Sequence, residues 1–422
     1  MSYEKIVLSP EAHNAFVSNH PQGDVMQLTA WGELKKTTGW TYDLIAIGQE
    51  GEPLAAALIL YRTMGPFTLA YAPRGPVVDL TDESLTRAIF NRMLETAAGR
   101  GAFLLKVDPD TSVEDTKTME LMLSLGYRHR GWDRSMTYNA QPRFAAITYL
   151  TNEPMEEQFN RLTSKVRGTI RRTMRNGLFF EKADTDKLPH FAKLIDTTAE
   201  RENFSGRPLS YFQALYRFFE PLRSETIDMQ LFLTGVDLEE RIAKNYADVQ
   251  DREREIDRLK DRQAAGEELT AGQLDQLGQL ERNATRLRDE LKDFEARMEA
   301  GETKVYLAGA LYLQCGKRGY YLYGGSSNDY RDLMPNYFMQ WKVMKYAYDR
   351  GVRIYDMGGI SGMDDGDPAL DPAPGLWDFK KRFDAERVER LGEFDLVFRP
   401  LYAKVYKTVQ GFREWRKKNK HD

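Results

Sequence analysis

One succession of predicted elements occurs twice in this sequence of 422 residues, and it limits the possible folds more than any other feature. In each copy two β-rich runs flank a glycine-containing turn, as in a β-hairpin, and a helical pattern and a further strand follow. The first copy comprises 54–61, 67–72, 85–100 and 102–107, and the second comprises 305–314, 320–325, 336–350 and 352–357. A hairpin followed by a helix and a strand is typical of mixed α/β sheets. The repetition therefore predicts two related α/β domains that pack together.

Length, charge and cysteine content agree with this prediction. The chain is long enough for two ordinary domains and an insertion. Its 60 Lys and Arg nearly balance its 64 Asp and Glu, which argues against a dedicated DNA-binding protein. Cys315 is the single cysteine, so an intramolecular disulfide is excluded. There is no signal-peptide pattern and no run approaching the ~18 apolar residues of a spanning helix, so we expect a soluble cytoplasmic protein.

The signatures of several reaction classes are missing from the sequence. The five histidines are scattered and lie at no metal-ligand spacing, and there is no dinucleotide fingerprint, P-loop or nucleophile elbow. We therefore expect neither a metal nor a cofactor. Hydride transfer, nucleotide hydrolysis and α/β-hydrolase chemistry lose support.

The segment 164–176 is the most basic part of the chain and contains no acidic residue. On a helix, Val166, Ile170 and Met174 would form an apolar stripe and leave the cations on the other face. These cations are Lys165, Arg167, Arg171, Arg172 and Arg175. A solvated face usually mixes both signs of charge, so this pattern favours a phosphate-bearing partner over a plain surface helix.

A charged segment, 238–300, interrupts β-rich sequence and shows a seven-residue hydrophobic repeat. The repeating residues are Ile242, Val249 and Ile256, then Leu277, Ala284, Leu291 and Met298, with Leu280, Leu287 and Phe294 as a second seam. Two such helices joined by a short turn predict an antiparallel coiled-coil hairpin, with arms of roughly 25 residues that reach ~40 Å. Dimerisation and contact with a large partner such as tRNA are both open roles for it.

Four further features each allow a structural and a functional interpretation. Lys35 lies in the last turn of a predicted helix, 27–36, and Arg74 lies in a stiff loop with two prolines. Asp108 follows a strand, where it either takes part in chemistry or caps the next helix. The tail 412–420 mixes cations with aromatic residues and is either a solvated end or a weak contact with an anionic membrane surface.

Eight short stretches together carry a resemblance to a known family. They are, in order, QLTAWGELKK, YAPRGP, KVDPD, SKVRGTIRR, GRPLSY, YYLYGGSSNDYRDLMPNYFMQ, IYDMGG and GLWDFKKRF. Through them nearly the whole chain resembles the Fem family of non-ribosomal peptidyltransferases, and most of all the members that add the first bridge residue to lipid II. One such stretch would be a weak signal, whereas eight in order are specific.

The resemblance implies two acetyltransferase-like (GNAT) domains, an α/β fold, with the coiled-coil hairpin inserted in the second. The first domain would span 1–145 and be completed by 384–422. The second would span 146–383 and contain the hairpin at 238–302.

The resemblance also implies an activity and its partners. An amino acid (Gly, Ala or Ser) would pass from aminoacyl-tRNA to the stem-peptide lysine of lipid II or of soluble UDP-MurNAc-pentapeptide. Contact with the inner membrane face and with related Fem-type transferases is compatible with this role. Two alternatives stay open: a catalytically inactive tRNA-binding or scaffold protein, and a CoA-dependent acetyltransferase, for which no pyrophosphate-binding signature is found.

The resemblance assigns roles to single residues of this chain. Lys35, Arg207 and Tyr211 would hold the phosphates and sugar of the precursor, Arg207 and Tyr211 from a predicted loop at 201–211. The other expected substrate-binding residues are Arg74, Tyr321 and Tyr323, the two tyrosines lining a peptide channel. Phe379 and Lys380 would sit where the aminoacyl ester meets the acceptor amine, and Asp108 is a candidate base. The expected tRNA-binding residues are Lys165, Arg167, Arg171 and Arg172.

Aminolysis of an ester makes two demands on such a site. Negative charge develops on the carbonyl oxygen, and a fixed cation such as Lys380 stabilises it. The attacking lysine amine has a pKa of about 10.4 when free and must become neutral. Asp108 is one candidate proton acceptor. The ribose hydroxyls of the tRNA are the other, and we favour them because positioning of an activated ester supplies much of the rate.

Overall fold

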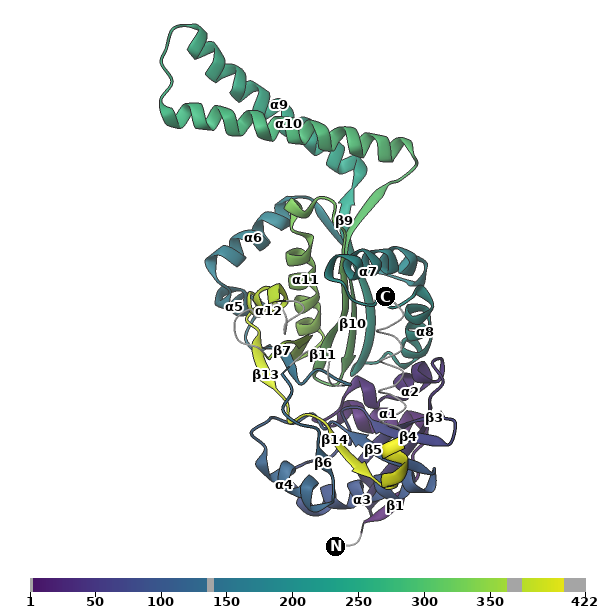
Figure 1. The fold of residues 1–422 in the computed structure, drawn as a ribbon. Helices are drawn as coiled ribbons and strands as arrows, with labels where there is room; N and C mark the ends of the chain where they lie inside the picture. The colour runs from purple at the N-terminus through teal and green to yellow at the C-terminus, as the bar shows by residue number, and fades with distance from the viewer. Residues whose placement is uncertain (1–2, 135–139, 363–373, 406–422) are drawn as a thin grey trace.

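Two mixed β-sheets stand one above the other, and a pair of long helices projects from the upper one (Figure 1). The computed structural model describes residues 3–134, 140–362 and 374–405, so the basic tail 412–420 lies outside the described part. Within that part, no helix combines the length and the apolar character needed to cross a membrane.

The first sheet has seven strands. In spatial order these are β1 (Glu4–Ile6), β2 (Thr41–Gln49), β3 (Glu52–Met64), β4 (Phe67–Ala72), β5 (Ala102–Val107), β14 (Phe394–Val397) and β6 (Arg128–His129). Strands β4 and β5 are parallel and are joined through α3 (Glu83–Gly99), whereas the other neighbours are antiparallel.

The second sheet also has seven strands. Their order is β13 (Glu386–Glu389), β7 (Phe144–Tyr149), β12 (Ile354–Ile360), β11 (Arg318–Ser326), β10 (Lys304–Cys315), β9 (Ile227–Asp237) and β8 (Leu178–Ala183). Strands β11 and β12 are parallel and are joined through α11 (Pro335–Asp349). Each sheet thus contains a hairpin, a helix and a strand parallel to its predecessor, which confirms the predicted repeat.

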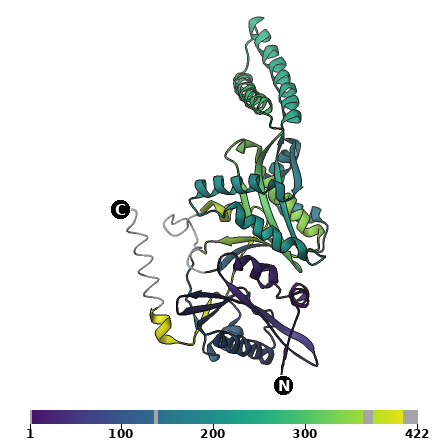
Figure 2. The same cartoon turned by 90° about the vertical axis from the view of Figure 1, so that its right-hand side faces the viewer.

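Helices cover both faces of both sheets (Figures 1 and 2). On the first sheet, α1 (Pro10–Asn19) and α2 (Thr29–Lys36) lie opposite α3 and α4 (Thr116–Ser124). On the second, α7 (Leu188–Glu202) and α8 (Leu209–Phe219) lie opposite α5 (Met155–Arg161), α6 (Ser164–Arg175), α11 and α12 (Pro374–Lys381). The loop predicted at 201–211 is therefore shorter, because α7 continues to Glu202, where left-handed Asn203 ends it, and α8 begins at Leu209.

One apolar cluster is shared by the two sheets. Alternation along β3 directs Leu58 and Leu60 into this cluster and Ile59 toward α3 on the other side. The fully buried members from the second sheet and its helices include Phe191, Phe212, Leu215, Leu231, Leu311 and Leu313. The sheets therefore do not form two separate cores joined by a linker, because they bury apolar surface against each other.

The chain returns to the first sheet later than the sequence predicts. Strand β13 pairs with β7 of the second sheet, with Glu386 opposite Ile147, and only β14 joins the first sheet beside β5. The sequence predicts that residues 384–422 complete the first domain. In the structure the chain joins that domain only after Glu389. Pairing with β13 satisfies the backbone groups of β7 that would otherwise lie at an open sheet edge.

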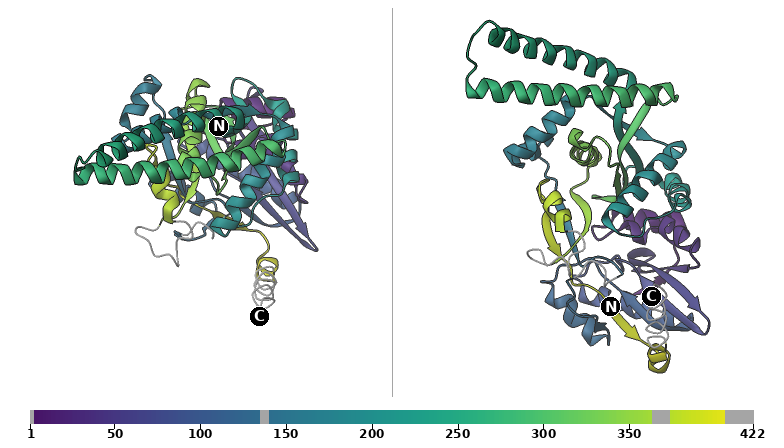
Figure 3. Two further views of the ribbon diagram at one scale, coloured as in Figure 1. Left: turned by 90° about the horizontal axis from the view of Figure 1, so that it is seen from above. Right: turned by 45° about the horizontal axis from the view of Figure 1, so that its top comes forward.

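The inserted segment is a helical hairpin made of α9 (Leu238–Ala264) and α10 (Ala271–Glu299), which we call the arm (Figures 1 and 3). The predicted seam residues that are buried are Val249, Ile256, Ala284, Leu287, Leu291 and Phe294. Met298 was also expected in the seam but is 40% exposed, in the last turn of α10. A polar layer that the repeat did not predict lies beside them, where Arg241 and Asn245 both donate to Glu290.

The base of the arm is packed into the second domain. Phe294 is fully buried, and its ring lies 4.7 Å from that of Tyr330, between centroids. Ion pairs join Arg297 to Asp329 at 3.6 Å and Arg286 to Asp332. The arm therefore leaves the body from a fixed base.

Replacing Phe294 with Ala should loosen this base and lower the free energy of unfolding by roughly 3–5 kcal/mol, as for other buried Phe side chains. Equilibrium urea unfolding measures the loss. Leu274→Ala, on the same helix but 48% exposed, is the matched control and should change stability by less than about 0.5 kcal/mol. Equal losses in the two variants would contradict the packing described here.

Candidate active site

Four of the predicted substrate-binding residues gather where the two domains meet. Helix α2 packs against α8, and this contact brings Lys35 near Arg207 and Tyr211. The Arg207 guanidinium lies 5.2 Å from the centre of the Tyr211 ring, and the Tyr323 hydroxyl donates to the Tyr211 hydroxyl at 3.1 Å. The structure therefore joins residues that are separated by more than half of the chain.

The charge balance of this group favours an anion. Burial, and then the neighbouring Arg207, lower the pKa of Lys35 to about 8. Its Nζ lies 4.7 Å from the centre of the Trp31 ring. Among the described residues, neither Lys35 nor Arg207 forms an ion pair with a carboxylate. Two cations held together without a counter-charge repel each other, and a phosphate between them would relieve that repulsion.

The two tyrosines predicted to line one channel lie on opposite faces of β11. The pairing register with β10 shifts by one residue, so that Leu311 faces Tyr323 and Tyr312 faces Tyr321. Tyr323 consequently packs with α8, whereas Tyr321 packs in the cluster that contains α11. Such a bulge reverses the alternation that an unbroken strand would keep. Tyr323 belongs to the Lys35 group, and Tyr321 does not.

Lys380 is buried on the other face of the second sheet. It lies in the last turn of α12, is 7% exposed, and donates from Nζ to the carbonyl oxygens of Gly358 and Gly359 at 3.2 and 2.9 Å. Burial lowers its pKa to about 8, and the carboxylate of Asp356 opposes that shift. An ammonium has three protons to donate, so one of them is not used by these two carbonyls.

Phe379 forms an aromatic wall next to Lys380. Its ring centre lies 5.5 Å from that of Tyr337 and 5.3 Å from that of Phe383, both close to edge-on. Phe383 is fully buried, whereas Phe379 is only partly buried. The exposed edge of this wall would exclude water from whatever approaches Lys380.

Asp108 and Arg74 form a buried pair within the first domain. The backbone N–H of Arg74 donates to Asp108 Oδ1 at 2.9 Å, and its guanidinium lies 3.7 Å from Oδ2. Burial raises the pKa of Asp108 to about 7 against the opposing charge of Arg74. Arg74 also donates to the carbonyl of Pro142 and is only 6% exposed. The polar contacts of this pair do not include Lys380, so the structure does not place the candidate base beside the candidate cation.

The basic helix α6 presents its cations to solvent largely as predicted. Val166, Ile170 and Thr173 face the core, and Met174 is 45% exposed because positions i, i+4 and i+7 complete the buried stripe. Lys165, Arg171 and Arg172 are exposed, and no carboxylate of a described residue pairs with them. Arg167 is less free, because it donates to the carbonyl of Asn160 at 3.0 Å.

A buried ionic cluster was not predicted from the sequence. Asp110, just after β5, pairs with Arg318 of β11 and with Arg390, and Arg390 also pairs with Asp356 of β12. Two of these residues lie within the stretches KVDPD and IYDMGG, but no local pattern indicates that they meet. Burial acts to raise the pKa of Asp110, but Arg318 and Arg390 lower that pKa far below its usual range.

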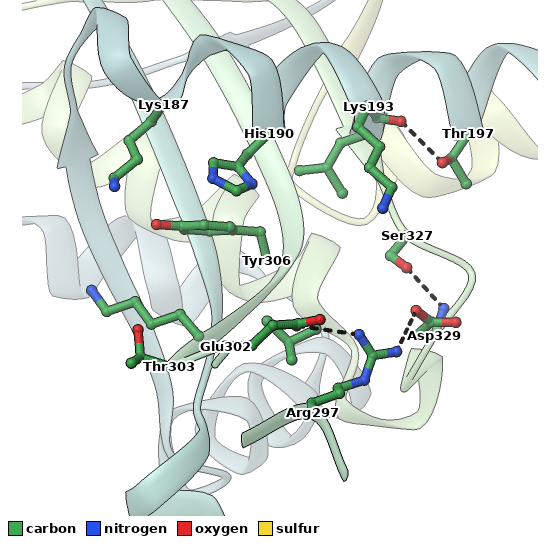
Figure 4. A pocket seen from close by; sticks show the side chains of 13 residues that line it. Lys187, His190, Lys193, Thr197, Arg297, Glu302, Thr303, Tyr306, Ser327 and Asp329 are labelled. Carbon is green, nitrogen blue, oxygen red and sulfur yellow. Dashed lines mark hydrogen bonds and ion pairs between the residues drawn. The ribbon is translucent and has the colours of Figure 1, made fainter. Parts of the chain in front are cut away.

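A separate cavity of about 560 Å³ opens at the base of the arm (Figure 4). It is lined by charged and aromatic side chains that include His190, Lys193, Arg297, Lys304, Tyr306 and Asp329. The His190 ring lies over that of Tyr306 at 4.6 Å. Most of the cations are neutralised, Arg297 by Asp329 and Lys304 by Glu181, so this cavity lacks the uncompensated charge of the Lys35 group.

Comparison with known proteins first defines a class. The crystal structure of FemX matches with a TM-score of 0.78 and 33% identity, over 95% of this chain and 99% of that chain. The sequence is 35% identical over 408 residues, 95% of each chain, to the lipid II:glycine glycyltransferase of Staphylococcus aureus strain USA300. The fold is thus that of a two-domain α/β transferase, as predicted.

The FemAB family model matches residues 8–411, and the chain belongs to the FemAB family. The family predicted from the eight stretches is therefore confirmed.

The lowered pKa of Lys35 can be tested by chemical labelling. At pH 8 a larger fraction of this amine is neutral than for a free lysine, so acetic anhydride should label Lys35 roughly tenfold faster than its neighbour Lys36. Lys36 is exposed and paired with Glu33 at 2.7 Å, and it serves as the internal control. Competitive labelling with mass spectrometry gives both rates.

Two further conditions check the same site. Arg207→Ala removes a like charge, so the pKa of Lys35 rises and its labelling slows. Pyrophosphate should protect Lys35 and leave Lys36 unchanged. Equal rates for both lysines in every condition would show that the pair does not act as an anion site.

Proposed function

We propose that the protein transfers an amino acid (Gly, Ala or Ser) from aminoacyl-tRNA to the stem-peptide lysine ε-amine of lipid II. The observation that supports this most is the uncompensated pair Lys35 and Arg207 at the domain junction, which suits the diphosphate of a peptidoglycan precursor. The relatives are lipid II:glycine glycyltransferases, which favours lipid II as the acceptor and glycine as the donor amino acid.

The acceptor would be held by its charged and sugar portions. Lys35 and Arg207 would contact the diphosphate, while the paired hydroxyls of Tyr211 and Tyr323 offer hydrogen bonds beside it. Soluble UDP-MurNAc-pentapeptide carries the same diphosphate, so this site alone does not discriminate between the two acceptors. Use of lipid II would bring the protein to the inner face of the membrane, where the basic tail 412–420 would be attracted to anionic lipid.

The reaction would take place at Lys380. The acceptor amine attacks the ester carbonyl, a C–N bond forms, the ester C–O bond breaks, and the ribose hydroxyl leaves with the proton that the amine gives up. With a pKa of about 8, Lys380 is mostly an ammonium at pH 7, and its third proton would face the developing oxyanion. Phe379 would keep water from the ester. Asp108 makes no polar contact with Lys380, so we favour a ribose hydroxyl as the proton carrier.

The donor would be bound through its phosphates. The exposed cations Lys165, Arg171 and Arg172 on α6 lie on the same side of the second sheet as α12, which carries Lys380 in its last turn. A tRNA whose backbone rests on α6 would thus carry its aminoacyl end toward that lysine.

The first assay is transfer of radiolabelled Gly, Ala or Ser from charged tRNA to lysine-containing lipid II. Lys380→Ala should lower turnover by on the order of 10²-fold, as for the loss of an oxyanion donor. Lys381→Ala, the exposed neighbour, is the matched control and should stay near wild type. Near-normal turnover of Lys380→Ala would remove Lys380 from the mechanism. Binding of tRNA without transfer would favour the scaffold alternative, and acetyl-CoA consumption the acetyltransferase alternative.

Substitutions on α6 test the donor site independently. Arg171→Ala and Arg172→Ala should each weaken tRNA binding and lower the slope of log affinity against log salt by about 1, because each removes one phosphate contact. The acceptor KM should not change. Arg282 is an exposed cation on the arm, and Arg282→Ala tests whether tRNA binds to the arm instead of to α6. A loss with Arg282→Ala alone would assign tRNA binding to the arm instead.

A further inference from the structure

The buried ionic cluster links the two domains through four side chains. Arg390 Nε donates to Asp110 at 2.5 Å, and its NH2 group donates to Asp356 at 3.0 Å. Arg318 approaches the same two carboxylates at 2.6 and 3.9 Å. All four side chains are at most 17% exposed. Two arginines and two carboxylates balance in charge, which is the arrangement that makes burial of ionised groups tolerable.

This cluster continues to the backbone that holds Lys380. Asp356 Oδ1 accepts a hydrogen bond from the N–H of Gly358 at 2.7 Å. Gly358 has φ +82°, a conformation that favours glycine, and the pairing of β12 with β7 shifts register between Asp356 and Gly359. The carbonyls of Gly358 and Gly359 then accept from Lys380 Nζ. An unbroken chain of contacts therefore runs from Asp110 in the first domain to Lys380.

The surroundings of Lys380 leave Asp356 as the charge that acts on it. Strands β7 and β12 and residue Tyr337 of α11 pack against α12. Of these, β12 contributes Asp356 and also Tyr355, whose hydroxyl accepts from Gln340 at 2.8 Å. Strand β7 contributes Tyr149 as its titratable residue, and the Tyr337 hydroxyl is engaged by Arg382. The pKa of Lys380 responds to burial and, in the opposite sense, to Asp356.

We propose that Asp110 and Asp356 are positioning residues, which act through Arg390 and Arg318 to hold the Gly358–Gly359 corner and the Lys380 ammonium in register with the first domain. This rests on the proposed function, in which Lys380 meets the ester and the first domain supplies part of the acceptor site. Asp356 has a second effect, because its charge favours the protonated form of Lys380. Neither carboxylate touches substrate.

The test uses Asp356→Asn in the full-length protein. The amide oxygen still accepts from Gly358, but the charge is lost and the arginine pairing is weakened. Turnover should fall roughly 10- to 100-fold, as for a small misplacement of a reacting group, with little change in the acceptor KM. Removing a negative charge lowers the pKa of Lys380. Turnover that needs the ammonium should therefore decline at a lower pH than the wild-type limit near 8.

Asp110→Asn separates position from charge. Asp110 is connected to Asp356, and so to Lys380, only through an arginine. The Asp110→Asn variant should therefore lower turnover but shift the pH limit less than Asp356→Asn does. Asp228→Asn is the matched control, because Asp228 is also buried and accepts from Arg223 and Tyr346 without any link to Gly358. It should lower stability and leave the pH limit unchanged. If all three variants lose activity in proportion to stability, with unchanged pH profiles, the cluster is only structural and the proposal is wrong.

A measurement without substrate distinguishes failure of this proposal from failure of the proposed function. The 13Cε resonance of Lys380 in lysine-labelled protein, assigned with Lys380→Arg, reports its titration directly. A lower pKa in Asp356→Asn but not in Asp228→Asn supports the coupling even if the wild type transfers no amino acid, in which case the proposed function alone fails. An unchanged titration in Asp356→Asn, with transfer by the wild type intact, overturns the proposal alone.

Discussion

Burial of one apolar cluster between the two sheets is the constraint on which the rest of the structure depends. Side chains of α2 and β3 from the first domain and of α7, α8 and β10 from the second lie in the same interior. Removal of apolar surface from water contributes about 25 cal/mol per Å², so opening this junction would expose a large and costly surface. The contact of α2 with α8, and with it the spacing of Lys35 and Arg207, follows from that packing and not from any attraction between the two cations.

Desolvation acts on two lysines with different consequences. Burial lowers the pKa of Lys35 and of Lys380 to about 8 in each case. The neighbour of Lys35 is another cation, so an arriving anion would raise the pKa of Lys35 and favour its charged state further. The neighbour of Lys380 is the carboxylate of Asp356, which is present permanently. The first lysine therefore suits recognition of an anionic ligand, whereas the second has a resident counter-charge before any ligand binds.

Local sequence patterns predict the helices and strands of this protein but not the contacts between them. The repeated hairpin, helix and strand, the helical hairpin and the exposed cations of α6 all depend on periodicities within one segment, and the structure has them. The bulge that separates Tyr321 from Tyr323, which the family resemblance assigned to one channel, breaks the two-residue period of a regular strand. The ionic cluster joins Asp110 with Arg318, Asp356 and Arg390, which lie more than 200 residues away, and β13 pairs with a strand more than 230 residues before it. No single segment contains the information for such contacts.

The arm leaves and re-enters the second sheet at adjacent strands. Asp237, at the end of β9, lies opposite Lys304, at the start of β10, so the two ends of the insertion are one strand spacing apart, about 4.8 Å. A tight turn would close that gap equally well, and every other strand pairing would stay as it is. Beyond its packed base, the segment between these two residues can therefore lengthen, shorten or be exchanged in evolution without any change of topology, because a change at such a tip disturbs no buried backbone. Selection on what the arm contacts is in this way uncoupled from selection on the chemistry of the body.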